Sequence, residues 1–268
     1  MRQFDSGHVA TACPGVFLVA LAAIAVPGSA LAADTGFSLA VGAEYTTGEY
    51  GGEQSVDEVY VPLTGKYETQ RLSFRLTVPF LSVRAPEGTY TEGPGGEPIV
   101  GEGPRVTESG IGDVLASLTV YDVFVSGSGD VALDLTGKVK LGTADVDKGL
   151  GTGEPDFTVQ ADLFRFFDRF TAIGTLGYTL RGDPDAVDLE DAVFVSLGGN
   201  YAVAPGTRVG LYYDFREASL PGNDDIQELS ATMSQRMSED WRVSGYVIAG
   251  FSDSSPDWGA GVSVSHAF

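Results

Sequence analysis

Side chains alternate at the period of a β-strand along most of this chain of 268 residues. In RLSFRLTVPF (71–80), for example, apolar side chains at every second position alternate with Ser73, Arg75 and Thr77. About twelve segments share this pattern and no convincing amphipathic helix separates them, so the chain is restricted to an all-β fold. The predicted strands are 36–48, 57–67, 70–83, 110–125, 130–142, 156–166, 169–181, 191–203, 207–216, 227–237, 241–251 and 257–268.

Alternating apolar and polar side chains are also found in the strands of a soluble β-sandwich. The lengths of the connections between strands distinguish a membrane barrel from such a sandwich. Every second connection is tight, whereas those between are mostly longer, up to the stretch 84–109. Short and long connections that alternate around an even number of strands place both termini at one end, as in barrels with short periplasmic turns and longer extracellular loops. The sequence therefore predicts a transmembrane, antiparallel, up-and-down β-barrel of about twelve strands.

Aromatic residues near the ends of the predicted strands lie on the same strand face as the apolar side chains. This placement is expected of the aromatic girdles at the two lipid interfaces of a barrel. They are Tyr45, Tyr67, Tyr178, Tyr201, Trp241, Trp258 and Phe268. An open sheet edge in hydrocarbon would leave backbone groups unsatisfied, so we expect the last strand to close the barrel against the first. Phe268 would then lie at the periplasmic interface, where the barrel-assembly machinery reads it. Pro62 and Pro79 fall inside predicted strands, where we expect bulges.

The beginning of the chain reads as a secretory signal peptide. GVFLVALAAIAV (15–26) is too short to span a bilayer as a helix, and small residues follow it at Ala30, Ala32 and Ala33. The alternative is a buried N-terminal helix. We predict a signal peptide at 1–33, a barrel at 34–268, and a location in the outer membrane of a Gram-negative cell.

The charge distribution limits the partners. The chain carries a formal net charge of −21, which disfavours nucleic acid because phosphate binding needs basic patches. Each of the six longer connections is net acidic, so the negative charge gathers at the extracellular rim. One loop could supply carboxylates to Ca²⁺, although its spacing matches no recognised calcium loop. The candidate metal ligands are Asp183, Asp185, Asp188 and Asp191.

Charged and tyrosyl side chains on the strand face opposite the apolar one predict a polar lumen. The lumen should be narrow, because a barrel of about twelve strands is intermediate in width between small barrels filled by side chains and wide porins. The candidate lining residues are Arg75, Asp113, Lys138, Lys140, Arg181, Arg208, Tyr212 and Arg242. The alternative is a salt-bridged plug. We expect no enzyme and no resident cofactor, because the predicted mature chain has a single histidine, His266, at the periplasmic end.

Two stretches resemble a known family. GIGDVLASLTVYDVF (110–124) and GKVKLGTADVDKGLGTGEPDFTVQADLFRFF (137–167) are similar to the outer-membrane transporter family named after the meta-pathway of phenol degradation. Matching positions are Gly112, Asp113, Gly151, Gly153 and Asp156, whereas Gly142 and Ala144 replace the usual Pro and Gly. The resemblance implies a channel between periplasm and exterior, with hydrophobic or aromatic compounds as candidate solutes.

Together these patterns predict a passive outer-membrane channel for uptake or efflux of small solutes. The alternative is a non-conducting structural barrel whose acidic loops bind divalent cations, lipopolysaccharide or a partner protein. In both cases outer-membrane lipid and lipopolysaccharide surround the barrel. The solute itself is not identified by the sequence.

Overall fold

The computed structural model describes residues 35–91, 96–184 and 188–268, and almost all of its regular structure is β-strand. The predicted signal peptide at 1–33 lies outside the described residues. The strands are β1 (Gly36–Gly48), β2 (Val56–Glu68), β3 (Leu72–Pro86), β4 (Arg105–Ile111), β5 (Val114–Val125), β6 (Val131–Leu141), β7 (Asp156–Phe166), β8 (Phe170–Leu180), β9 (Ala192–Ala204), β10 (Thr207–Arg216), β11 (Ile226–Arg236), β12 (Trp241–Gly250) and β13 (Trp258–Ala267). A short 3₁₀ turn, η1 (Val146–Lys148), lies in the loop after β6.

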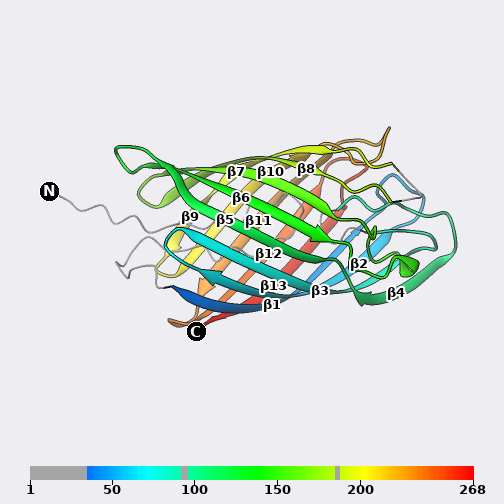
Figure 1. Ribbon diagram of the computed structural model, residues 1–268, viewed down its shortest axis with the longest axis horizontal. Helices are drawn as coiled ribbons and strands as arrows, with labels where there is room; N and C mark the ends of the chain where they lie inside the picture. Colours follow the sequence, from blue (N-terminus) through cyan, green and yellow to red (C-terminus); the bar gives the residue numbers. More distant parts are fainter. Residues whose placement is uncertain (1–34, 92–95, 185–187) are drawn as a thin grey trace.

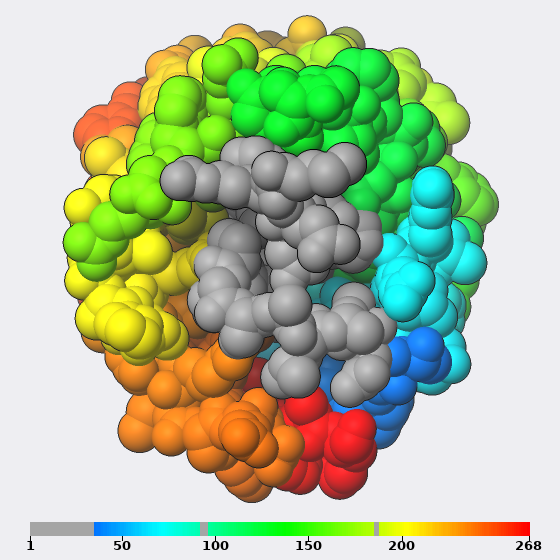
Figure 2. Space-filling view, turned by 90° about the vertical axis from the view of Figure 1, so that its left-hand side faces the viewer, coloured from blue at the N-terminus to red at the C-terminus, as the bar shows by residue number. Residues whose placement is uncertain are grey.

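The described strands close into a barrel. Neighbours in sequence pair antiparallel, and β13 pairs with β1 over Ser38–Thr47, as the colours around the ring in Figure 2 show. Both β4 and β5 pair with β3, on either side of Gly112 and Asp113, so these two strands share one place in the wall. The wall therefore has twelve strand positions, which confirms the predicted fold.

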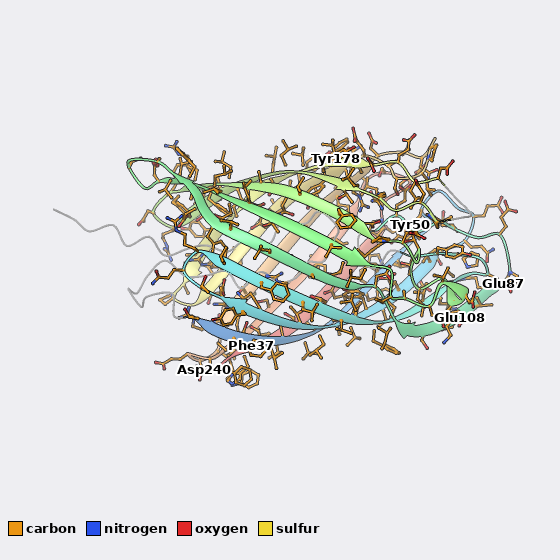
Figure 3. All side chains as sticks on the ribbon, in the orientation of Figure 1. Phe37, Tyr50, Glu87, Glu108, Tyr178 and Asp240 are labelled. Atoms are coloured by element: carbon orange, nitrogen blue, oxygen red, sulfur yellow. The ribbon has the colours of Figure 1, made fainter. Side chains whose placement is uncertain are left out.

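The two ends of the barrel differ as the connections predicted. Short turns gather at one end with Phe268, whose amide donates to the carbonyl of Phe37 at 2.9 Å. The longer loops gather at the other end, on the right of Figure 1. Figure 3 places Phe37 and Asp240 at the first end and Glu87 and Glu108 at the second. We call the first end periplasmic and the second extracellular.

The apolar side chains of the alternating pattern lie on the outer surface of the barrel. The alternation places Leu72, Leu76, Val139, Leu211 and Val262 on the lipid-facing side; four of them are exposed, whereas Val139 is half-buried. Aromatic rings cluster near the strand ends: His266 packs between Trp241 and Phe268, with ring centroids 4.6 and 4.5 Å away. His266 thus belongs to an aromatic girdle. No helix within the described residues is long and apolar enough to cross a membrane.

The two prolines interrupt the wall differently from the prediction. Pro62 and Pro79 lie opposite each other in the β2–β3 pair, whose register runs on without a shift. The expected bulges are therefore wrong. Instead, the β1–β2 ladder lacks paired residues between Val41–Leu63 and Glu44–Tyr60, because Pro62 has no N–H to donate.

The lipid-facing surface gives a depth-dependent prediction. Leu176 lies near the middle of β8 and Val203 near the periplasmic end of β9, and both side chains are exposed. Leu176→Arg should lower the free energy of unfolding from lipid vesicles by about 2–4 kcal/mol, whereas Val203→Arg should cost only about 0–1 kcal/mol. Urea titration followed by tryptophan fluorescence measures both, and equal costs would contradict the predicted membrane position.

Candidate transport lumen

Carboxylates and tyrosines line the extracellular half of the lumen. Glu44, Glu58 and Glu228 are buried on the inner faces of β1, β2 and β11. The hydroxyl of Tyr246 donates to the Glu44 carboxylate at 2.8 Å. The Tyr246 ring lies across β13 at Gly261, where a Cβ would overlap it, so glycine is what lets the two side chains meet. This half of the lumen is therefore lined by buried carboxyl and phenol groups.

Lys140 and Asp113, two of the predicted lining residues, form a buried ion cluster. The Lys140 Nζ lies 2.9 Å from a carboxylate oxygen of Asp156 and 3.8 Å from one of Asp113. The other oxygen of Asp113 accepts the amides of Thr143 and Ala144, both at 2.9 Å. The cluster therefore anchors the loop after β6 to the inner wall.

The longest loop, 87–104, contacts two sides of the extracellular mouth through its described residues. It leaves the wall between β3 and β4, yet the Thr91 hydroxyl donates to Glu58 on β2 at 2.5 Å. Further along, the carboxylate of Glu97 accepts the amide and hydroxyl of Ser219, both at 2.8 Å, and the Asn223 amide at 2.7 Å. Ser219 and Asn223 belong to the loop between β10 and β11, on the opposite side of the ring. The loop is thus held on both sides of the opening.

An apolar cluster reinforces this cover at the mouth. Its members come from the inner faces of β2 and β3 and from the loops above them, and we call them the mouth cluster: Tyr50, Val56, Tyr60, Leu81, Val83, Ala85 and Leu150, with Val100 and Ala144 packed against it. Burial, together with the charges of Glu58 and Glu228, raises the pKa of the Tyr50 phenol above its usual value, so that it stays neutral. The extracellular mouth is therefore narrowed by packed loops.

Basic side chains occupy the periplasmic end of the lumen. Arg208 and Arg242 are the second residues of β10 and β12, and Arg75 lies near the start of β3. Lys66 of β2 and Arg236 of β11 lie at the same end. Lys66 forms an ion pair with Glu68 at 2.5 Å. The three predicted lining arginines are thus brought together by the tertiary structure.

The remaining predicted residues lie in different surroundings. Tyr212 is buried in an apolar cluster with Ala132, Phe164 and Ile173. Lys138 is half-buried on β6, and Arg181 lies just after β8 with its amide donating to Asp191 at 3.0 Å. Both side chains interact with other parts of the protein.

The candidate calcium ligands do not converge in the described part of the chain. The carboxylate of Asp183 accepts the Leu189 amide at 2.9 Å, and that of Asp191 accepts the Tyr178 hydroxyl at 2.8 Å. Asp188 is exposed, and Asp185 lies outside the described residues. No group of three or more His, Cys, Asp or Glu within the described residues could hold a metal ion. Calcium binding by this loop stays a prediction.

Sequence reasoning did not single out Glu97 or the mouth cluster. Glu97 stands in GPGGEPIV (93–100), whose glycines and prolines predicted only turns. The available signal was the apolar pair Ile99 and Val100 at the end of an acidic, glycine-rich loop. Such residues are costly to leave in water, and Val100 packs against the mouth cluster.

Comparisons with solved structures agree with the barrel. An outer membrane channel from Pseudomonas putida F1 has a TM-score of 0.68 at 14% sequence identity, covering 87% of this chain and 96% of that chain. The CymD monoaromatic hydrocarbon channel has a TM-score of 0.48 at 11% identity, covering 87% and 89%. At these identities the likeness is one of fold, and the fold is that of an outer-membrane β-barrel.

Comparison with sequences gives the family. A search of curated proteins finds no match. The model of the family described as "Putative MetA-pathway of phenol degradation" matches residues 33–268, which is the whole barrel. The predicted resemblance is thereby confirmed, and the chain belongs to the family of the MetA pathway of phenol degradation.

Proposed function

We propose that this barrel is a passive outer-membrane channel for small solutes. The observation that carries the proposal is the composition of the inner face, where ionisable and tyrosyl side chains project from most of the wall. A barrel that served only as a scaffold could be filled with apolar side chains, as small barrels are. The function proposed is not an enzymatic one.

The lumen residues named above would line the path. A solute from outside would pass the loops at the mouth, then the carboxylates Glu44, Glu58 and Glu228, and then the arginines at the periplasmic end. Charged rings of this kind set selectivity in channels. The family and the monoaromatic hydrocarbon channel among the similar folds support small organic compounds as the solute class.

A second candidate is a barrel that is closed at rest. The observation in its favour is the mouth cluster together with loop 87–104, which narrow the extracellular opening. The acidic loops would then bind divalent cations, lipopolysaccharide or a partner protein. Contact with the assembly machinery through Phe268 and removal of residues 1–33 are further proposals, which apply to both candidates.

Recording the refolded protein in a planar lipid bilayer tests the two candidates. A channel should give discrete current steps at moderate voltage in potassium chloride. Silence over a wide range of voltages, from protein whose heat-modifiable gel mobility shows that it is folded, would favour the closed barrel. The same preparation serves the experiments below.

A further inference from the structure

Four cationic side chains share one carboxylate at the periplasmic end of the lumen. We call this group the entrance network: Lys66 and Glu68 on β2, Arg75 on β3, Arg208 on β10 and Arg242 on β12. All five residues lie on the inner face, close to the periplasmic ends of their strands. The network therefore has an excess of positive charge.

Two of the cations face each other on neighbouring strands. Lys66 and Arg75 are paired residues in the β2–β3 ladder, where the Cβ atoms of opposite side chains lie about 4.5–5.5 Å apart. Like charges directly opposite each other destabilise a sheet. The pair therefore needs a negative charge close by.

Glu68 supplies this negative charge. Its carboxylate lies 2.5 Å from the Lys66 Nζ and accepts the hydroxyl of Tyr121, on β5, at 2.7 Å. It also attracts Arg75 and Arg242 electrostatically. The hydrogen bond from Tyr121 holds the carboxylate in place, so that one negative charge acts on cations from three strands.

The closed ring lets Arg242 take part in this network. Between β12 and β2 lie β13 and β1, which present small inward side chains at this end, such as Ser265 opposite Arg242 and Ser38 opposite Lys66. Across these two strands, Arg242 acts electrostatically on both Lys66 and Glu68. The contact follows from the pairing of β13 with β1.

One carboxylate does not balance four cations. Arg208 is only 6% exposed, and the charged groups that act on it most strongly are Arg242 and Arg236, which repel it. Arg236 itself is exposed at the same end of β11. Glu68 thus reduces the positive charge of this end without cancelling it.

The network borders the lumen. The Glu68 side chain is 32% exposed, and Arg75 and Arg242 are half-buried on the inner face. An ion passing this end of the barrel would meet their charges through water, where a charge acts over a Debye length of about 8 Å at physiological ionic strength. Rings of charged side chains set the selectivity of channels in this way.

Resting on the proposed channel function, we propose that Glu68 determines the ion selectivity of the periplasmic entrance. As the carboxylate shared by Lys66, Arg75 and Arg242, it limits the positive potential of this end and therefore its preference for anions. The extracellular connections are net acidic, so the two ends of the lumen have opposite charge. Glu68 sets how far the periplasmic end departs from neutrality.

Reversal potentials of the refolded protein in a potassium chloride gradient test this role. Glu68→Gln removes the charge, while its amide oxygen can still accept the Tyr121 hydroxyl. The chloride-to-potassium permeability ratio should rise about threefold or more at low ionic strength, because a unit charge about 6 Å from an ion in water changes its local concentration by about that factor. Glu68→Asp keeps the charge and should rescue most of the wild-type ratio.

Glu239→Gln is the matched control. Glu239 is exposed in the turn between β11 and β12, at the same end of the barrel. The control removes the same charge outside the entrance network, so it should change the permeability ratio much less. A shift in the Glu68→Gln variant no larger than that of the control would overturn the proposal.

A compensating variant separates charge from structure. Lys66→Met combined with Glu68→Gln removes one charge of each sign and should return the ratio to near the wild-type value. A double variant as anion-selective as Glu68→Gln alone would overturn the proposal, because the effect would then not come from the net charge.

Arg75→Met alone should shift the ratio in the opposite direction, toward potassium. This variant keeps the proposal testable where gel mobility shows that Glu68→Gln does not fold. An unchanged ratio in Arg75→Met would refute the entrance network.

The outcome is separable from that of the channel proposal itself. Silence of the wild type and of every folded variant would refute the channel and, with it, this role of Glu68. Current whose selectivity does not respond to Glu68 would refute the role of Glu68 and keep the channel.

Discussion

Replacing Glu97 by alanine should raise the single-channel conductance several-fold, because the loop across the mouth loses its hold on the opposite rim. The Glu97 carboxylate accepts three hydrogen bonds from Ser219 and Asn223 and is only 1% exposed. Hydrogen bonds to a charged group contribute about 1.5–3 kcal/mol each, so their loss should shift the loop from mostly attached to mostly detached.

Glu87→Ala is the matched control for this experiment. Glu87 belongs to the same loop and carries the same charge, but its side chain is exposed. The control therefore removes one negative charge from the mouth without removing the attachment. Equal conductance changes in both variants would mean that charge, and not the hold on Ser219, controls the current.

Hydrogen exchange provides a readout of the same attachment that is independent of current. The Ser219 amide donates to Glu97, so Glu97→Ala should speed the exchange of that amide and Glu87→Ala should not. Unchanged protection of Ser219 in the Glu97 variant would show that the two loops hold together by other contacts, such as those of the mouth cluster.

Lys140→Met should lower the free energy of unfolding by about 3–5 kcal/mol. Lys140 lies between the carboxylates of Asp113 and Asp156, and all three side chains are almost fully buried. Removing the cation leaves two neighbouring carboxylates without a counter-charge in a site from which water is largely excluded. Urea unfolding from lipid vesicles measures the loss.

Two further variants show whether the loss comes from the buried charges. Lys148→Met removes a lysine from the loop after β6, which the cluster anchors. Its ion pair with Asp145 spans 3.9 Å between half-exposed side chains, so its loss should cost less than about 1 kcal/mol. Adding Asp113→Asn and Asp156→Asn to Lys140→Met should recover much of the stability. A Lys140 variant no less stable than the Lys148 variant would contradict the ion-cluster account.

Much of the fold followed from the sequence because the membrane makes the pattern regular. Lipid on one side and a polar lumen on the other force a change of side-chain character at every residue, so Leu72 and Leu76 could be placed outside from the period alone. The absence of water in the bilayer core then requires closure, so the pairing of 257–268 with 36–48 was predictable as well.

The interior followed only in part. The alternation of side chains along each strand could place Arg75, Arg208 and Arg242 on the inner face. It could not show that they lie together at the periplasmic end of the barrel. That depends on the closed ring, in which β2, β1 and β13 lie between β3 and β12, and β1 and β13 have small inward residues at this end. Parity also could not distinguish Lys140, held between carboxylates, from an arginine without a partner, because local sequence does not record contacts between distant strands.

The sequence by itself determined the strands, their order, the facing of their side chains and the family, since each depends on local period or on motifs within short stretches. The tertiary structure alone decided how the extracellular loops fold over the mouth and which inner charges are paired. Glu97 reaches Ser219 across the ring, a contact between residues separated by more than a hundred positions. Such contacts follow from the closure and shear of the whole barrel, and no local pattern in the chain encodes them.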